Sequence, residues 1–156
     1  MSSYLIIKYS HIISMVLLFG TGLGSAFYKW MADRSGNITH IAITNRHVVF
    51  ADWIFTTPTI IIQPITGLWM LSIAQIPITT PWVLISLILY FIAGVCWLPV
   101  AWLQIRMKAL ANEAQETNQP LLLRYRQYCR YWYWLGIPAF LAMICIVFLM
   151  VLKPVF

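Results

Sequence analysis

Four long apolar stretches constrain this chain more than any other feature of its sequence. They cover approximately residues 4–28, 48–73, 81–103 and 131–152. A helix needs about 20 mostly apolar residues to cross about 30 Å of hydrocarbon, and each stretch is long enough. Backbone groups in lipid must be hydrogen-bonded internally, which favours a bundle of spanning helices. The sequence therefore predicts an all-α polytopic membrane protein, a four-transmembrane-helix bundle that forms a single integral membrane domain over 1–156.

The composition excludes a water-soluble domain. The chain has 156 residues, of which 62% are hydrophobic and 9% are charged, whereas a soluble domain carries about 25% charged residues. The net charge of +6 does not indicate nucleic-acid binding, because the basic residues lie between apolar spans. The three cysteines have no metal-ligand or disulfide spacing, so we expect inert thiols used in packing.

The first apolar stretch has some features of a secretory signal peptide. Lys8 precedes the apolar run, and small residues follow at 24–26. The run is longer than a usual signal core, so we expect it to be retained as a spanning helix.

The basic residues predict how the bundle is oriented. Eight of them lie between spans one and two or between spans three and four, and only Lys8 and Lys153 lie on the other side. The positive-inside rule then places both basic loops in the cytoplasm and both termini in the periplasm. The expected location is a bacterial inner membrane, with several passes. The eight residues are Lys29, Arg34, Arg46, Arg106, Lys108, Arg124, Arg126 and Arg130.

The loop between spans three and four is long and contains its own helical signals. Residues 104–130 are predicted to extend span three, turn at Pro120, and begin a second helix that leads into span four. Basic and aromatic residues at 124–134 suit the headgroup region. We expect this belt to contact anionic lipid headgroups at the cytoplasmic face.

Polar residues inside the spans are the candidate functional positions, because burying them in hydrocarbon is costly. Lys8 and His11 are three residues apart and share one helix face. At 1.5 Å per residue, His11 lies about 10 Å below the outer surface, and Thr66 and Gly67 lie at about the same depth. Gln63 is one turn deeper. His11 is then a haem-iron ligand, a proton relay, or a structural histidine hydrogen-bonded to Thr66.

Small residues and prolines mark further positions. Gly20 and Gly24 form a GxxxG pair, which lets a second helix or a flat cofactor approach closely. Pro64 has no N–H to donate to the carbonyl of Ile60. We therefore expect a kink that leaves this carbonyl free toward the bundle interior.

Asp52 is the only acidic residue that the predicted spans place close to the membrane. Arg46 precedes it on the same span, and Arg106 follows span three on the same side. We expect Asp52 to be a buried ion-pair member, with Arg46 or a cation of the third loop as its partner, or a proton acceptor.

Four short strings along the chain carry a family resemblance. They are Lys8-x-x-His11-Ile12-Ile13, Val49-x-x-Asp52, Gln63-Pro64-x-Thr66-Gly67 and Trp97-Leu98-Pro99. Together they resemble a bacterial family of uncharacterised, predicted four-span integral membrane proteins. The resemblance covers nearly the whole chain and implies an architecture and a compartment, but no reaction.

A second resemblance is confined to span one. Lys8-x-x-His11, followed by a glycine-containing span, is similar to HemJ-type protoporphyrinogen oxidase, a small four-span membrane protein. This resemblance implies haem b with His11 as the axial ligand to its iron. We expect Gly20, Gly24 and Gly67 to make room and Lys8 to face a propionate. The leading hypothesis is therefore a haem-b-binding redox or porphyrin-handling protein.

Two other functions stay open. A structural or accessory protein would dock onto a membrane-protein partner, or form a homodimer through Gly20 and Gly24. A proton-coupled channel or carrier would use Asp52 and His11. The sequence contains no hydrolase triad, phosphate loop or paired-carboxylate motif, so enzymatic activity is not established.

Overall fold

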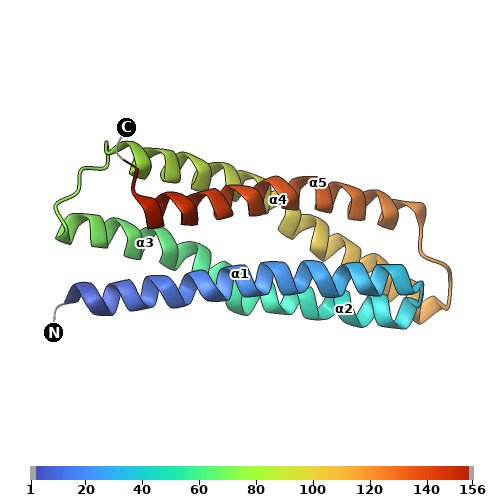
Figure 1. Ribbon diagram of the computed structural model, residues 1–156. Helices are drawn as coiled ribbons and strands as arrows, with labels where there is room; N and C mark the ends of the chain where they lie inside the picture. The colour runs from blue at the N-terminus through green and yellow to red at the C-terminus, as the bar shows by residue number, and fades with distance from the viewer. Residues whose placement is uncertain (1–2, 155–156) are drawn as a thin grey trace.

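The computed structural model describes residues 3–154. Within that range every regular element is helical: α1 (Ser3–Ser35), α2 (Ile38–Ala51), the π-helix η1 (Asp52–Thr56), α3 (Thr57–Ile73), α4 (Pro81–Thr117) and α5 (Leu123–Leu152). Because α2, η1 and α3 follow one another without a break, the chain forms four long helices (Figure 1). Each is long and apolar enough to cross a membrane. The predicted all-α, four-helix architecture is confirmed.

The four helices run up and down, so the connections alternate between two ends of the bundle. In Figure 1 the termini and the 74–80 connection lie at one end, and the 36–37 and 118–122 connections lie at the other. We call these the terminal end and the basic end, because most Lys and Arg residues lie near the second. α1 packs on α2 and α3, α2 packs on α4, and α4 pairs with α5.

The helices continue past the predicted spans at the basic end. α1 ends at Ser35, and α2 begins at Ile38. Gly36 adopts a left-handed φ of 66°, and the Asn37 side chain accepts the N–H of His40 to cap α2. The segment 29–47, which the apolar stretches leave as a loop, is therefore almost entirely helical. The charged residues of this segment end the apolar stretches, but they do not end the helices. α1 and α2 are separated by the turn at Gly36 and Asn37.

The segment 104–130 is helical on both sides of a short connection. α4 continues to Thr117, and Asn118 ends it in a left-handed conformation with φ 54°. Pro120 lies in the connection, and α5 begins at Leu123. At about 1.5 Å per residue, α4 is about 55 Å long, which exceeds the hydrocarbon thickness of about 30 Å.

The best-buried apolar core lies toward the basic end. Elsewhere along the bundle, large apolar side chains such as Leu23, Phe91 and Phe148 are exposed, as expected for a surface that faces lipid. The core side chains come from α1, α2, α4 and α5. They are Ala32, Ile41, Ala42, Val100, Leu103, Met107, Ala111, Tyr125 and Trp132.

Candidate functional site

His11 lies in a hydrogen-bonded seam between α1 and α3. Its Nδ1 is 2.7 Å from the Thr66 hydroxyl, which itself donates to the carbonyl of Ile62 at 2.7 Å. Because the Thr66 proton is used for that carbonyl, Nδ1 of His11 is assigned as the donor, and Nε2 carries no proton. The structure thus brings together His11 and Thr66, the pair that the helix rise places at one depth.

Gln63 holds the same seam one turn deeper. Its Nε2 donates to the backbone carbonyl of His11 at 2.9 Å and to the hydroxyl of Ser14 at 2.7 Å. The Ser14 hydroxyl donates to the same carbonyl at 3.0 Å. These buried bonds join α1 to α3 through side-chain and backbone groups together, so the polar residues at this seam have a structural role.

The residues expected to make room for haem are not all near His11. A Cβ on Gly67 would lie 3.4 Å from Cε1 of His11, so the imidazole already occupies the gap over this glycine. Gly20 and Gly24 are rotated from His11 by about 180° and about 220° around α1, at 100° per residue. Lys8 is exposed, whereas His11 is buried. Of the three glycines, Gly67 alone lies beside His11, so the structure does not bring the expected haem-site residues together.

Apart from the single histidine His11, we find no cluster of metal-ligating side chains in the described chain. Residues 3–154 contain no group of three or more His, Cys, Asp or Glu side chains placed to hold a metal ion. The three cysteines are free thiols, on α4 and α5.

Asp52 begins the π-helix η1 and is 8% exposed. Its carboxyl accepts the Thr56 hydroxyl at 2.8 Å, and the Gln104 side chain from α4 lies against it. The N–H of Thr57 donates to the carbonyl of Asp52, which is the i→i+5 hydrogen bond of a π-helix. The next residue, Pro58, has no N–H to donate.

The expected ion pair of Asp52 does not form. Arg46 extends instead toward α4, with Nη1 3.4 Å from Asn112 Oδ1. The Arg106 guanidinium lies 5.4 Å from the ring centre of Trp102. Among residues 3–154 the only ion pair is Lys29 with Asp33. Asp52 is therefore a buried carboxyl with hydrogen bonds but without a cation.

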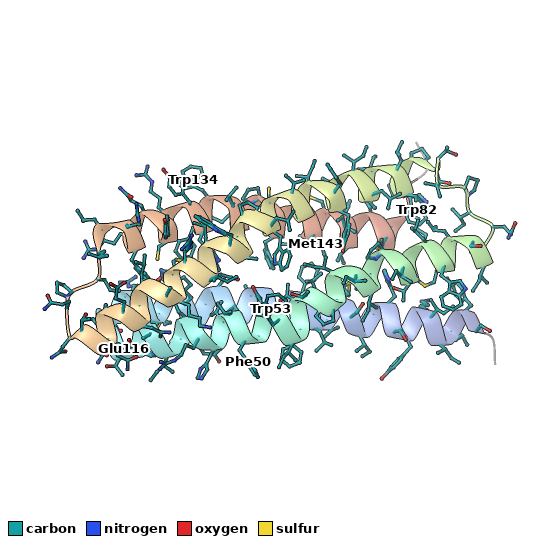
Figure 2. All side chains as sticks on the ribbon, turned by 180° about the vertical axis from the view of Figure 1, so that it is seen from behind. Phe50, Trp53, Trp82, Glu116, Trp134 and Met143 are labelled. Atoms are coloured by element: carbon teal, nitrogen blue, oxygen red, sulfur yellow. The ribbon has the colours of Figure 1, made fainter. Side chains whose placement is uncertain are left out.

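Asp52 lies on the wall of a cleft of about 300 Å³ between the helices, part of whose lining is exposed at the surface of the bundle. The cleft is lined by α1, η1, the start of α3, α4 and α5, and its surface is overwhelmingly apolar. In Figure 2, Met143, which lines the cleft, lies between the ribbons near the middle of the bundle. Small residues on facing helices leave the space: Gly22 and Ala26 on α1, Ala93 and Gly94 on α4, and Gly136 and Ala139 on α5.

Trp132 lines the same cleft and has an unsatisfied donor. The residue is 6% exposed, and its Nε1 is buried without a hydrogen-bond partner. An unpaired buried donor costs about 1–3 kcal/mol relative to a bonded one. The cleft is thus lined by apolar side chains, by Asp52, whose carboxyl has no cation, and by Trp132, whose Nε1 has no acceptor.

The carbonyl that Pro64 leaves without an N–H faces a neighbouring helix, as predicted. The carbonyl of Ile60, which Pro64 cannot reach with an N–H, accepts the hydroxyl of Tyr90 from α4. Tyr90 and Ile60 both line the cleft. This bond satisfies the freed carbonyl and joins α3 to α4.

The strongest polar cluster in the described chain was not predicted. Lys29 is completely buried, and its ammonium donates to Asp33 at 3.1 Å, Asn45 at 3.2 Å and the Tyr125 hydroxyl at 2.9 Å. All three ammonium protons therefore have acceptors. Tyr125 in turn donates to Asp33 at 2.6 Å. This cluster links α1, α2 and α5 at the basic end.

The sequence carries a signal for this cluster. Lys29 and Asp33 are four residues apart, the spacing of an ion pair on one helix face. Both residues follow the apolar stretch that ends at residue 28, so hydropathy alone predicts a loop there. The prediction that Asp52 is the only acidic residue close to a span is therefore wrong, because α1 continues through Asp33.

Comparison with known proteins supplies a family. The model of a family described as "Predicted integral membrane protein (DUF2269)" matches residues 5–154, as the four sequence strings predict. No curated protein and no solved structure matches the chain. The match covers nearly the whole sequence, and the four apolar helices agree with its description. The chain therefore belongs to this family of predicted integral membrane proteins, DUF2269.

Proposed function

We propose that this membrane protein binds a lipid-soluble small molecule in the cleft between its helices. The apolar body of the ligand occupies the space left by the small residues, and its polar group lies near Asp52 and Trp132. One observation carries the proposal: the same apolar cleft is lined by Asp52, a buried carboxyl without a cation, and by Trp132, whose buried Nε1 has no acceptor.

The energetics of the cleft support a ligand with hydrogen-bond acceptors. One acceptor on the ligand would remove the penalty of about 1–3 kcal/mol for the unpaired Nε1 of Trp132. Because burial without a cation favours a neutral carboxyl, Asp52 can accept from Thr56 and Gln104 and donate its own proton to a second acceptor on the ligand. A cleft with mostly apolar walls and a few polar groups is the usual form of a small-molecule site.

Filling the cleft tests the proposal. Gly136 lines the cleft, whereas Gly20 does not, and a Cβ on either glycine would meet no atom within 4 Å. Wild-type protein, Gly136→Leu and Gly20→Leu are purified in mild detergent, and their organic extracts are compared by mass spectrometry. We expect about one molecule of the same compound per chain with wild type and Gly20→Leu, and its loss with Gly136→Leu. Equal, bulk-lipid extracts from all three proteins would contradict the proposal.

The visible spectrum tests the haem expectation separately. Because the His11 ring fills the gap over Gly67 and bonds to Thr66, we expect protein produced with haem precursor to show no haem absorption. His11→Ala should leave the spectrum unchanged. A Soret band that shifts on reduction with dithionite and vanishes in His11→Ala would establish haem at His11 instead.

A further inference from the structure

A second cavity lies at the basic end of the bundle. Its volume is about 450 Å³, and its walls are more polar than those of the cleft. The residues that line it come from the end of α1, the start of α2, the 118–122 connection and the start of α5. Two arginines, Arg34 and Arg126, are among them. We call it the basic-end cavity.

The basic-end cavity and the cleft meet at Tyr133, which lines both. On α1, Ala26 lines the cleft and Trp30, one turn later, lines the cavity. On α5, Cys129 lines the cavity and Gly136 lines the cleft, on either side of Tyr133. The two spaces therefore lie end to end along α1 and α5. The hydroxyl of Tyr133 is buried and has no hydrogen-bond partner.

The charge of the basic-end cavity favours an anion. Asp33 also lines it, but Lys29 neutralises this carboxylate at 3.1 Å, and the Tyr125 hydroxyl donates to it. The Arg34 guanidinium lies 5.0 Å from the ring centre of Trp30. In the part of the chain that the structure describes, neither Arg34 nor Arg126 has a carboxylate within ion-pair distance. Both guanidinium groups are thus free to bind a phosphate.

The length of the combined space matches one lipid leaflet. From Arg126 in the cavity to Met143 in the cleft, the lining of α5 covers 17 helical steps, or about 25 Å. A bilayer with its headgroups is about 40–45 Å thick, so one lipid molecule extends about 20 Å. The polar cavity lies toward the end of the bundle, and the apolar cleft lies toward its middle. A phospholipid has the same order, with its polar headgroup at the membrane surface and its acyl chains toward the bilayer centre.

We propose that the ligand is one anionic phospholipid, which occupies the cavity and the cleft together. Its phosphate binds Arg34 and Arg126. Its ester carbonyls, at the junction of the two spaces, accept hydrogen bonds from Tyr133, Trp132 and the neutral carboxyl of Asp52. An acyl chain occupies the apolar remainder of the cleft. This inference rests on the proposed function, because it names the ligand class of the cleft.

Headgroup selectivity tests the inference. Native mass spectrometry measures the binding of phosphatidylglycerol and of phosphatidylcholine with identical chains, with inorganic phosphate and glycerol phosphate as competitors. The test variant is Arg34→Gln/Arg126→Gln. The control is Arg124→Gln/Arg130→Gln, which removes the same charge from exposed α5 positions outside both cavities. We expect at least tenfold preference for the anionic lipid in wild type and control, and near-equal binding of the two lipids in the test variant.

The outcomes separate the inference from the proposed function. A preference that survives in Arg34→Gln/Arg126→Gln overturns the headgroup assignment, and displacement of the lipid by millimolar free phosphate overturns the lipid identity. If the test variant leaves binding unchanged while Gly136→Leu abolishes it, the inference fails and the proposed function stands. If neither changes what is bound, both fail. Tyr133→Phe should reduce lipid retention severalfold without changing headgroup preference.

Discussion

At the scale of single residues, the buried ionisable groups determine which substitutions should destabilise the protein or weaken ligand binding. Lys29 is completely buried, yet each of its ammonium protons has an acceptor, and the rings of Tyr125 and Trp132 lie 5.0 and 5.9 Å from its Nζ. Burying a charge is tolerated only with such partners. Asp52 is buried without a cation. We therefore assign Lys29 a structural role and Asp52 a role in ligand binding.

Lys29→Met should destabilise the protein strongly. It leaves Asp33 and Asn45 without their shared cation, and breaking a buried pair by removing one partner costs about 3–5 kcal/mol. The double variant Lys29→Met/Asp33→Leu should recover part of this loss, because neither charge then remains. Unfolding in mixed micelles measures both, with the exposed Arg124→Met as the control. A loss below 1 kcal/mol for Lys29→Met, or no recovery in the double variant, would contradict this account.

Asp52→Leu should weaken retention of the ligand about tenfold, the effect of losing one hydrogen bond of about 1.4 kcal/mol. Asp52→Asn keeps an oxygen that can accept the Thr56 hydroxyl and should retain the ligand more strongly than Asp52→Leu. Titration of delipidated protein by native mass spectrometry gives both values. Undiminished retention in Asp52→Leu would remove Asp52 from the site.

At the scale of elements, two prolines shape the helix that follows Gly36 and Asn37. Pro58 follows the π-helix that carries Asp52 after one residue, Thr57, and Pro64 frees the carbonyl of Ile60. Sequence reasoning predicted the freed carbonyl, because a missing N–H is a local property of proline. It could not predict that Tyr90 satisfies it, since that contact depends on how α4 packs against α3.

Tyr90→Phe should destabilise the bundle by about 1–3 kcal/mol, because the carbonyl of Ile60 loses its donor. Pro64→Ala supplies an N–H four residues after Ile60, so Tyr90→Phe should have little effect in the Pro64→Ala background. Unfolding of the four proteins of this double-mutant cycle gives the coupling energy. Additive effects would show that Pro64 and Tyr90 do not act through the same carbonyl.

The end of α1 depends on cap and turn residues, which a hydropathy profile does not take into account. Hydropathy predicts the four spans, but it does not predict the continuation of α1 through Lys29 and Asp33, because charged residues lower the hydropathy without ending a helix. The true end of α1 lies at the Gly36–Asn37 turn, whose left-handed residue and cap are visible in the sequence. Reading caps together with hydropathy would have placed Lys29 on a helix.

At the scale of the whole molecule, the bundle has two chemically different ends. The predicted depths of His11, Thr66 and Gly67 agree with their contacts in the structure, because helix rise places residues of antiparallel neighbours at a common depth. The cleft was not predicted. It depends on small residues from three helices facing one another, which requires the rotation of each helix about its axis.

The orientation of the bundle remains a prediction that labelling can check. With Cys96, Cys129 and Cys145 changed to serine, single cysteines are introduced as Thr79→Cys at the terminal end and Gln119→Cys at the basic end. The excess of Lys and Arg near the basic end predicts that an impermeant maleimide labels Thr79→Cys in intact spheroplasts, and Gln119→Cys only after lysis. The reverse pattern would place the basic end outside.

Photocrosslinking from the cleft wall tests the central claim most directly. Benzoylphenylalanine is introduced at position 140, a half-buried phenylalanine that lines the cleft, or at position 144, an exposed α5 residue outside it. After irradiation in native membranes, the mass added to the protein identifies the neighbour at each position. The account predicts one dominant anionic phospholipid at position 140 and a mixture with the composition of the bulk membrane at position 144. The same bulk mixture at both positions would show that the cleft is ordinary lipid-facing surface and holds no specific ligand.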